Sequence, residues 1–173
     1  KEDGFEMYFQ PIYSWKEKSF LSMEALLRLR DADGTLISPA EFIPVIEQTD
    51  MVCALDFYVL EQVCMDIRDW LKRGIQPIKV SVNFSRKHLS NPNLAKDIMK
   101  VLDKYSTESK YIEVELTETV DEVESDLLVR FMEELKGYNV SMSIDDFGTG
   151  YSSLNMLRSF PVDVLKIDKS FID

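Results

Sequence analysis

The sequence predicts an α/β fold in which parallel strands are arranged around a barrel. Strand-like and helix-like patterns alternate from residue 19 onward, which is typical of parallel strands joined by right-handed crossovers. Polar residues occupy every second position of several predicted strands, which indicates one polar and one apolar face of the sheet. The chain has 173 residues, of which 45% are hydrophobic, and no linker-like segment divides it. We therefore expect one domain over residues 1–173.

The first elements are two strands and a helix. Residues 5–14 and 19–30 have the composition of strands, and the polar sequence WKEK between them indicates a turn. A helix is predicted over residues 38–49, because Ser38 can cap it and Pro39 suits its first turn.

The later elements alternate along the chain. Apolar residues at spacings of three and four predict a helix over 51–74, with Gly74 at its end. We then expect strands over 78–85, 111–118, 140–145 and 162–168, and helices over 91–105, 121–138 and 151–160.

The polar face of the strands distinguishes a barrel from an open sheet. Helices cover both faces of an open doubly wound sheet, so its strands are apolar on both faces. In this chain one strand face is polar and becomes acidic toward the carboxyl end, which is the catalytic mouth of a barrel. The pattern favours the barrel, and it predicts a buried ion pair between Lys79 and Glu113 below the mouth. The polar positions are Lys79, Ser81, Asn83, Glu113, Glu115, Ser141, Ser143 and Asp145.

Composition and charge exclude several classes of protein. A net charge of -11 argues against a broad DNA- or RNA-binding surface. No apolar run approaches the roughly 18 residues of a membrane span. Cys53 and Cys64 lie in a helical pattern and His88 is the single histidine, so neither a zinc site nor a disulfide framework is indicated. We expect two packed thiols, a solvated His88 and a cytoplasmic location.

Five predicted strands place a polar residue at or near their carboxyl ends. Carboxylate and amide oxygens are hard ligands, which suit Mg²⁺ or Mn²⁺ better than zinc. Carboxylates crowded together without a cation would repel one another and raise their own pKa values. We therefore predict one or two metal ions at the mouth, with a lysine beside them to hold a phosphate or a water molecule. The five residues are Glu24, Asn83, Glu115, Asp145 and Lys166.

The two adjacent aspartates cannot both face the mouth from one regular strand. We expect Asp145 to be the last residue of its strand and Asp146 to be the first residue of the following loop. Gly148 and Gly150 would then allow the loop to turn Asp146 back toward the mouth.

Seven motifs give the chain a resemblance to the EAL domain family. The segment MEALLRLR holds the signature Glu24-Ala25-Leu26, and the other six motifs have the order and approximate spacing of that family. The resemblance runs from Phe5 to the last residue. It implies a modified TIM-type (β/α)8 barrel with an antiparallel first strand, and hydrolysis of cyclic di-GMP to linear pGpG with Mg²⁺ or Mn²⁺. The other motifs are FQPI, FIPVIEQ, SVNFS, ELTE, DDFGTGYSSL and LKID.

The resemblance also implies a role for individual residues. Asp146 would join a second metal ion, and Lys166 would position the attacking water or the phosphate. Gln10 and Arg28 would contact the nucleotide, and Glu118 would anchor the DDFGTG loop. The implied ligands of the first metal ion are Glu24, Asn83, Glu115 and Asp145.

The resemblance carries expectations about partners and completeness. Family members dimerise through the DDFGTG loop region and commonly follow GGDEF or sensory domains. They also continue through two more strands, which bring a late glutamate and a late glutamine. Since the sequence ends at Asp173, we expect an incomplete barrel of about six of the eight strands, and little or no hydrolysis by these residues alone.

Two other functions remain open at the level of sequence. One is a sensor module that binds cyclic di-GMP without cleaving it. The other sets the resemblance aside, because acidic strand ends with a lysine also suit a magnesium-dependent barrel enzyme that abstracts a proton beside a carboxylate.

Overall fold

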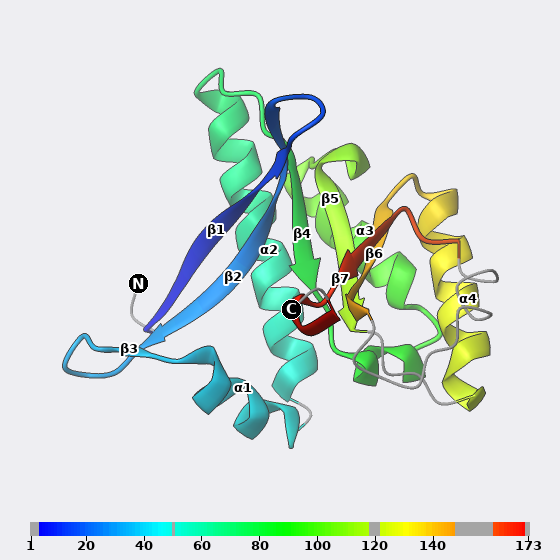
Figure 1. Ribbon diagram of the computed structural model, residues 1–173, viewed down its shortest axis with the longest axis horizontal. Coiled ribbons are helices and arrows are strands. Elements are labelled where there is room, and N and C mark those ends of the chain that lie inside the picture. Colours follow the sequence, from blue (N-terminus) through cyan, green and yellow to red (C-terminus); the bar gives the residue numbers. More distant parts are fainter. Residues whose placement is uncertain (1–3, 50, 118–121, 148–160, 172–173) are drawn as a thin grey trace.

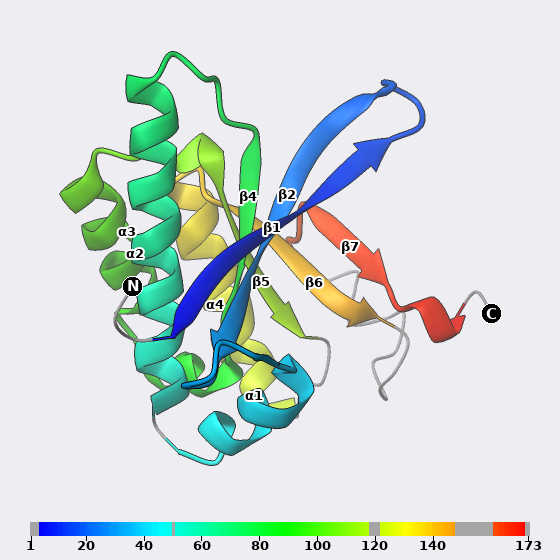
Figure 2. The same ribbon diagram turned by 90° about the vertical axis from the view of Figure 1, so that its left-hand side faces the viewer.

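A computed structural model describes residues 4–49, 51–117, 122–147 and 161–171. Strands β1 (Phe5–Ser14) and β2 (Ser19–Arg30) form an antiparallel hairpin, and the short strand β3 (Leu36–Ile37) pairs with β2. From β2 onward, β4 (Lys79–Asn83), β5 (Ile112–Thr117), β6 (Ser141–Phe147) and β7 (Val164–Ile167) are added in parallel. The order β1-β2-β4-β5-β6-β7 and the curled sheet in Figure 2 confirm the prediction of an incomplete barrel with an antiparallel first strand.

The helices lie mainly along one face of the sheet, where α2, α3 and α4 form a layer (Figures 1 and 2). Their bounds are α1 Pro39–Glu47, α2 Met51–Lys72, α3 Leu94–Tyr105 and α4 Glu122–Gly137, and the 3-10 helices are η1 Arg86–Ser90, η2 Ser109–Tyr111 and η3 Lys169–Phe171. Gly74 follows α2 with a φ of 75°, in agreement with the predicted helix end. Ser38 precedes α1, but its side chain makes no capping hydrogen bond. The predicted helix over 151–160 lies outside the described residues.

The core lies between the sheet and the α2–α3–α4 layer. The strand positions that alternate with the polar ones are buried against the helices, where Leu60, Ile67 and Ile98 are fully buried. Burial of these apolar side chains is the main stabilising contribution to such a fold. The strand residues that face the helices are Val80, Val82, Ile112, Val114, Met142 and Ile144.

The opposite face of the strands is polar and also buried, as the barrel prediction requires. Ser81, Glu113 and Ser143 are at most 3% exposed. Lys79 Nζ lies 3.7 Å from Glu113 Oε2 and donates a hydrogen bond of 2.6 Å to Ser141 Oγ. The predicted Lys79–Glu113 ion pair is therefore present below the carboxyl ends of the strands, but only Glu113 is buried, because 31% of the Lys79 side chain is exposed.

Strand β6 differs from its prediction at its carboxyl end. The strand continues through Phe147, so the prediction that it ends at Asp145 is wrong. Its pairing with β7 is interrupted between Ile144 and Phe147, and Asp146 has a φ of 54°. A bulge with one left-handed residue redirects the strand, and aspartate tolerates this conformation better than most residues. The turn therefore begins at Asp146 itself, and Gly148 and Gly150 lie outside the described residues.

Cys53 and Cys64 lie on α2, and His88 lies in η1. Cys64 is a buried free thiol, and burial raises its pKa to about 11, while Cys53 is half-buried. The prediction of a solvated His88 is wrong, because this residue lies in η1 with only 4% of its surface exposed. Within the described ranges, no helix combines the length and the apolar character that a membrane crossing requires.

Candidate active site

The sheet brings the carboxyl ends of its parallel strands to one edge. Asn83 is the last residue of β4 and lies opposite Glu115 of β5. Glu24 of β2 lies opposite Ser81, two residues before Asn83, and Asp145 of β6 lies opposite Thr117 at the end of β5. Parallel pairing in register therefore places the predicted residues at one mouth.

Hydrogen bonds connect four of the five predicted residues. Asn83 Nδ2 donates to Glu24 Oε1 at 2.9 Å, and Lys166 Nζ of β7 lies 3.2 Å from Glu24 Oε2. Lys166 Nζ also donates to Glu115 Oε1 and forms an ion pair with it. One cluster thus joins β2, β4, β5 and β7, although Glu24 and Lys166 are 142 positions apart in the sequence.

Glu115 is the most deeply buried carboxylate of the cluster. Its side chain is fully buried, and within the described ranges its Oε2 atom has no hydrogen-bond partner. Burial raises the pKa of Glu115 to about 7, because desolvation outweighs the hydrogen bond and the charge of Lys166, and Glu24 and Asp145 raise it further. The pKa of Lys166 is raised as well: desolvation opposes the rise, but the hydrogen bond to Glu115 and the nearby carboxylates outweigh it.

The two aspartates of β6 lie at the rim of this cluster. Asp145 is half-buried, and Asp146 is exposed on the bulge. Partial desolvation raises the pKa of Asp146, and the charges of Asp145, Asp168 and Glu24 raise it further against the opposing effect of Lys166. The charges of Asp145 and Asp146 therefore belong to the same electrostatic environment as those of Glu24 and Lys166.

Asp168 is a neighbour of the site that the sequence analysis did not single out. It follows β7, and its Oδ1 accepts a hydrogen bond of 2.8 Å from the amide of Ser170. Hydrogen bonds from the side chain and the backbone of Ser170 lower the pKa of Asp168. Its position as the last residue of the LKID motif was the signal that could have identified it.

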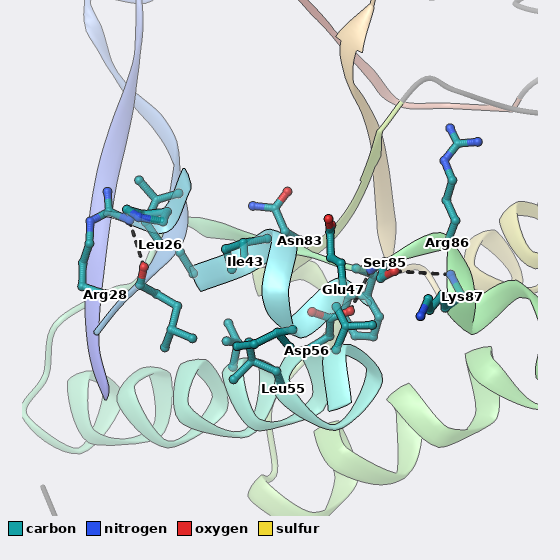
Figure 3. A pocket seen from close by; sticks show the side chains of 17 residues that line it. Leu26, Arg28, Ile43, Glu47, Leu55, Asp56, Asn83, Ser85, Arg86 and Lys87 are labelled. Atoms are coloured by element: carbon teal, nitrogen blue, oxygen red, sulfur yellow. Dashed lines mark hydrogen bonds between the residues drawn. The ribbon is translucent and has the colours of Figure 1, made fainter. Parts of the chain in front are cut away.

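A cavity adjoins the cluster on the side of α1 and α2. Its volume is about 530 Å³, and Asn83 lies between it and the carboxylates. Figure 3 shows Leu26 and Arg28 on one side of this cavity and Ser85, Arg86 and Lys87 on the other. The floor is apolar and includes Ile43, Ile46, Val52, Leu55 and Val59.

The predicted nucleotide contacts lie on the hairpin. Gln10 of β1 is exposed and lies directly opposite Glu24. Arg28 lines the cavity, where its guanidinium lies 5.8 Å from the centre of the Tyr8 ring and Nη1 donates to the Leu27 carbonyl at 2.9 Å. Glu118 lies outside the described residues.

The residues at the mouth suit a hard divalent cation chemically. The set combines carboxylates with an amide oxygen. The buried Oε2 atom of Glu115 accepts no hydrogen bond from the described residues, so it is available as a ligand. In the part of the chain that the structure describes, however, no three His, Cys, Asp or Glu side chains are gathered closely enough to hold a metal ion together. The ammonium group of Lys166 lies between Glu24 and Glu115 and supplies positive charge there.

Comparisons with known proteins agree with this architecture. The sequence profile of the EAL domain matches residues 1–173. The chain is 36% identical over 173 residues to the signaling protein YkoW of Bacillus subtilis, covering 100% of this chain and 22% of YkoW. It is also 36% identical over 172 residues to the cyclic di-GMP phosphodiesterase NbdA of Pseudomonas aeruginosa, covering 99% of this chain and 22% of NbdA.

A solved structure has the same arrangement of elements. The structure of the PaMucR phosphodiesterase in complex with c-di-GMP superposes with a TM-score of 0.89 at 32% sequence identity. The match covers 99% of this chain and 69% of that one. With the profile match over all 173 residues, these similarities identify the chain as a member of the EAL domain family.

Proposed function

We propose that this domain hydrolyses cyclic di-GMP to linear pGpG with the help of Mg²⁺ or Mn²⁺. The observation that carries the proposal is the cluster in which Asn83, Glu115 and Lys166 converge with Glu24 at the mouth of the sheet. The relative NbdA is named a cyclic di-GMP phosphodiesterase, and the PaMucR structure is a c-di-GMP complex, which supports the choice of substrate.

The acidic mouth explains why a divalent cation belongs to the proposal. Glu24, Asn83, Glu115 and Asp145 would hold the first ion, and Asp146 would contribute to a second. Bound divalent ions supply an activated water nucleophile and stabilise the charge of the leaving oxygen of a phosphodiester. Asn83 fixes one oxygen of Glu24 through its amide group, and Lys166 holds the carboxylates together and offers a positive charge to a phosphate.

The cavity beside Asn83 suits one guanine nucleotide of the substrate. Its volume of about 530 Å³ lies in the range of small-molecule pockets, and its floor is apolar enough to pack against a flat base. Arg28 would contribute a planar guanidinium to a phosphate or a guanine edge, and Gln10 would contact the nucleotide from β1. The phosphodiester would then lie over the carboxylates.

Turnover tests the proposal directly. The natural protein that contains this chain should convert cyclic di-GMP to pGpG with Mn²⁺, and chelation should abolish the conversion. Glu24→Gln should reduce kcat by at least about a hundredfold, because it removes one charged group from the proposed metal site. Glu61→Gln is a suitable control, because Glu61 lies on α2 and pairs with Lys104 rather than with the mouth. Full activity of Glu24→Gln would contradict the assignment.

A sensor that binds cyclic di-GMP without cleaving it is the second candidate. The observation in its favour is the pairing of Lys166 with two carboxylates, within a described region where no three His, Cys, Asp or Glu side chains are gathered as a metal site. Calorimetry discriminates between the two functions: nucleotide binding without pGpG formation in the presence of Mn²⁺ identifies the sensor.

The surroundings of the domain are also proposed. The chain spans 22% of the length of YkoW and of NbdA, so their remaining segments have no counterpart in it. We propose a neighbouring GGDEF or sensory domain, a cytoplasmic location and a homodimer formed through the DDFGTG region. Light scattering of the natural protein tests the dimer, and a monomer at micromolar concentration would contradict it.

A further inference from the structure

A buried pair of polar side chains lies behind the loop that follows β4. Asp56 of α2 and His88 of η1 are 13% and 4% exposed at their side chains. Asp56 Oδ2 accepts a hydrogen bond of 2.7 Å from the amide of Ser85 and lies 3.1 Å from His88 Nε2. Figure 3 shows Asp56 directly below Ser85 at the edge of the cavity. Asp56 also lines the cavity, but neither residue of this pair is among the proposed metal ligands or nucleotide contacts.

Aromatic packing fixes the orientation of the histidine. The His88 ring lies 5.3 Å from the ring of Phe57 and 5.1 Å from that of Phe84, measured between centroids. Because a carboxylate oxygen accepts hydrogen bonds, the contact with Asp56 assigns the ring hydrogen of His88 to its Nε2 atom. The amide of His88 also donates to the Ser85 carbonyl at 3.1 Å, which closes the turn between the two residues. Asp56 therefore holds both ends of this turn.

The same turn is connected to the proposed active site. Asn83 lies two residues before Ser85 and donates to Glu24 Oε1 at 2.9 Å. Between them, the amide of Phe84 donates to the carbonyl of Glu115 at 2.9 Å. The backbone from Asn83 to Ser85 is thus fixed by β5 on one side and by α2 on the other.

We propose that Asp56 and His88 are positioning residues, which hold the turn after β4 so that the side chain of Asn83 is directed at Glu24. This role rests on the proposed function for its catalytic meaning, but the order of the turn is a property of the chain itself. Loss of Asp56 leaves the amide of half-buried Ser85 and the Nε2 atom of buried His88 without their acceptor. Unsatisfied buried donors are costly, so the turn is expected to open toward water.

Three variants separate the elements of this arrangement. Asp56→Ala removes both hydrogen bonds. Asp56→Asn keeps an oxygen that can accept from Ser85, and His88→Phe keeps the aromatic packing but loses one bond. Glu61→Ala is the matched control, because Glu61 lies on the same helix and also accepts two hydrogen bonds, from Lys104 and Tyr105 at 2.9 Å each.

The rate of amide hydrogen exchange in the peptide over residues 84–90, measured without metal, reports how well the turn is ordered. Asp56→Ala should accelerate exchange there by at least about tenfold, and Asp56→Asn should restore most of the protection. The affinity for Mn²⁺, measured by electron paramagnetic resonance, should fall about 10- to 100-fold in Asp56→Ala, as for other residues that orient metal ligands. Glu61→Ala should leave both quantities unchanged.

Two results would overturn the proposal. One is wild-type exchange over residues 84–90 in Asp56→Ala, and the other is an equal acceleration in Glu61→Ala. If the wild type binds no Mn²⁺ and cleaves no cyclic di-GMP, the proposed function fails, and hydrogen exchange still decides whether the turn depends on Asp56.

Discussion

Replacement of Glu115 by glutamine should change stability and activity in opposite directions. Glu115 is fully buried, and its pKa of about 7 lies above the usual 4.5. A carboxyl whose pKa is raised by folding favours the folded state while it is protonated, and this contribution is lost as pH rises from the ordinary value through 7. At pH 8 the folded chain therefore carries the full cost of the buried charge.

The size of the effect follows from the pKa. The difference between 4.5 and about 7 corresponds to about 3 kcal/mol at pH 8. Lys166 offsets part of the gain in the variant, because it loses its ion pair with Glu115 and keeps the one with Glu24. At pH 8 we expect the unfolding free energy of Glu115→Gln to exceed that of the wild type by about 1–3 kcal/mol. At pH 5 the two unfolding free energies should differ by less than about 1 kcal/mol.

Urea denaturation followed by circular dichroism measures both values, with a chelator present to exclude metal ions. Glu61→Gln is the control of opposite sign: hydrogen bonds from Lys104 and Tyr105 lower the pKa of Glu61, so this variant should be destabilised at pH 8. The same Glu115→Gln protein should lose turnover of cyclic di-GMP. The reasoning would be refuted if Glu115→Gln were less stable than the wild type at pH 8, or if the difference between their unfolding free energies did not depend on pH.

Three further measurements test the cluster and the core. Lys166→Met should lower the unfolding free energy at pH 8 by about 3 kcal/mol in urea denaturation, because Glu24 and Glu115 lose their buried cationic partner. An unchanged unfolding free energy would show that the ion pairs do not stabilise the fold. The affinity for Mn²⁺, measured by calorimetry, should rise by up to about tenfold per pH unit below pH 7 and level off above pH 7, because the ion competes with the proton of Glu115. An affinity that does not change with pH would exclude Glu115 as a ligand. Leu60→Ala should cost about 3 kcal/mol of unfolding free energy, because Leu60 is fully buried; a cost below about 1 kcal/mol would show that the layer of helices repacks.

Local patterns made the strands and their polar face predictable. Side chains alternate across a strand, so the burial of Ser81, Glu113 and Ser143 could be inferred from spacing alone once a barrel was favoured. The convergence of Asn83 with Lys166 then followed, because parallel strands bring their carboxyl ends to one edge. These inferences needed no knowledge of side-chain contacts.

Features that depend on distant residues were not predictable. His88 is buried because Asp56 and Phe57, some thirty positions earlier, supply its hydrogen bond and its packing. The left-handed backbone at Asp146 arises where pairing with β7 is interrupted, and the local sequence pointed instead to the glycines that follow. Both misses reflect tertiary contacts that override local preference.

The charges at the mouth argue that nucleotide binding depends on cations. Glu24, Glu115, Asp145 and Asp146 contribute negative charge, and Lys166 is the cation that the structure pairs with two of them. That lysine does not neutralise the cluster, since burial and the neighbouring carboxylates still hold the pKa of Glu115 at about 7. A phosphodiester that approaches this mouth meets the charges of Asp145, Asp168 and Glu24, which add to partial desolvation in raising the pKa of Asp146. The carboxylates that would make hydrolysis possible thus oppose the binding of an anionic substrate by themselves, and bound divalent cations would remove that opposition for either of the proposed functions.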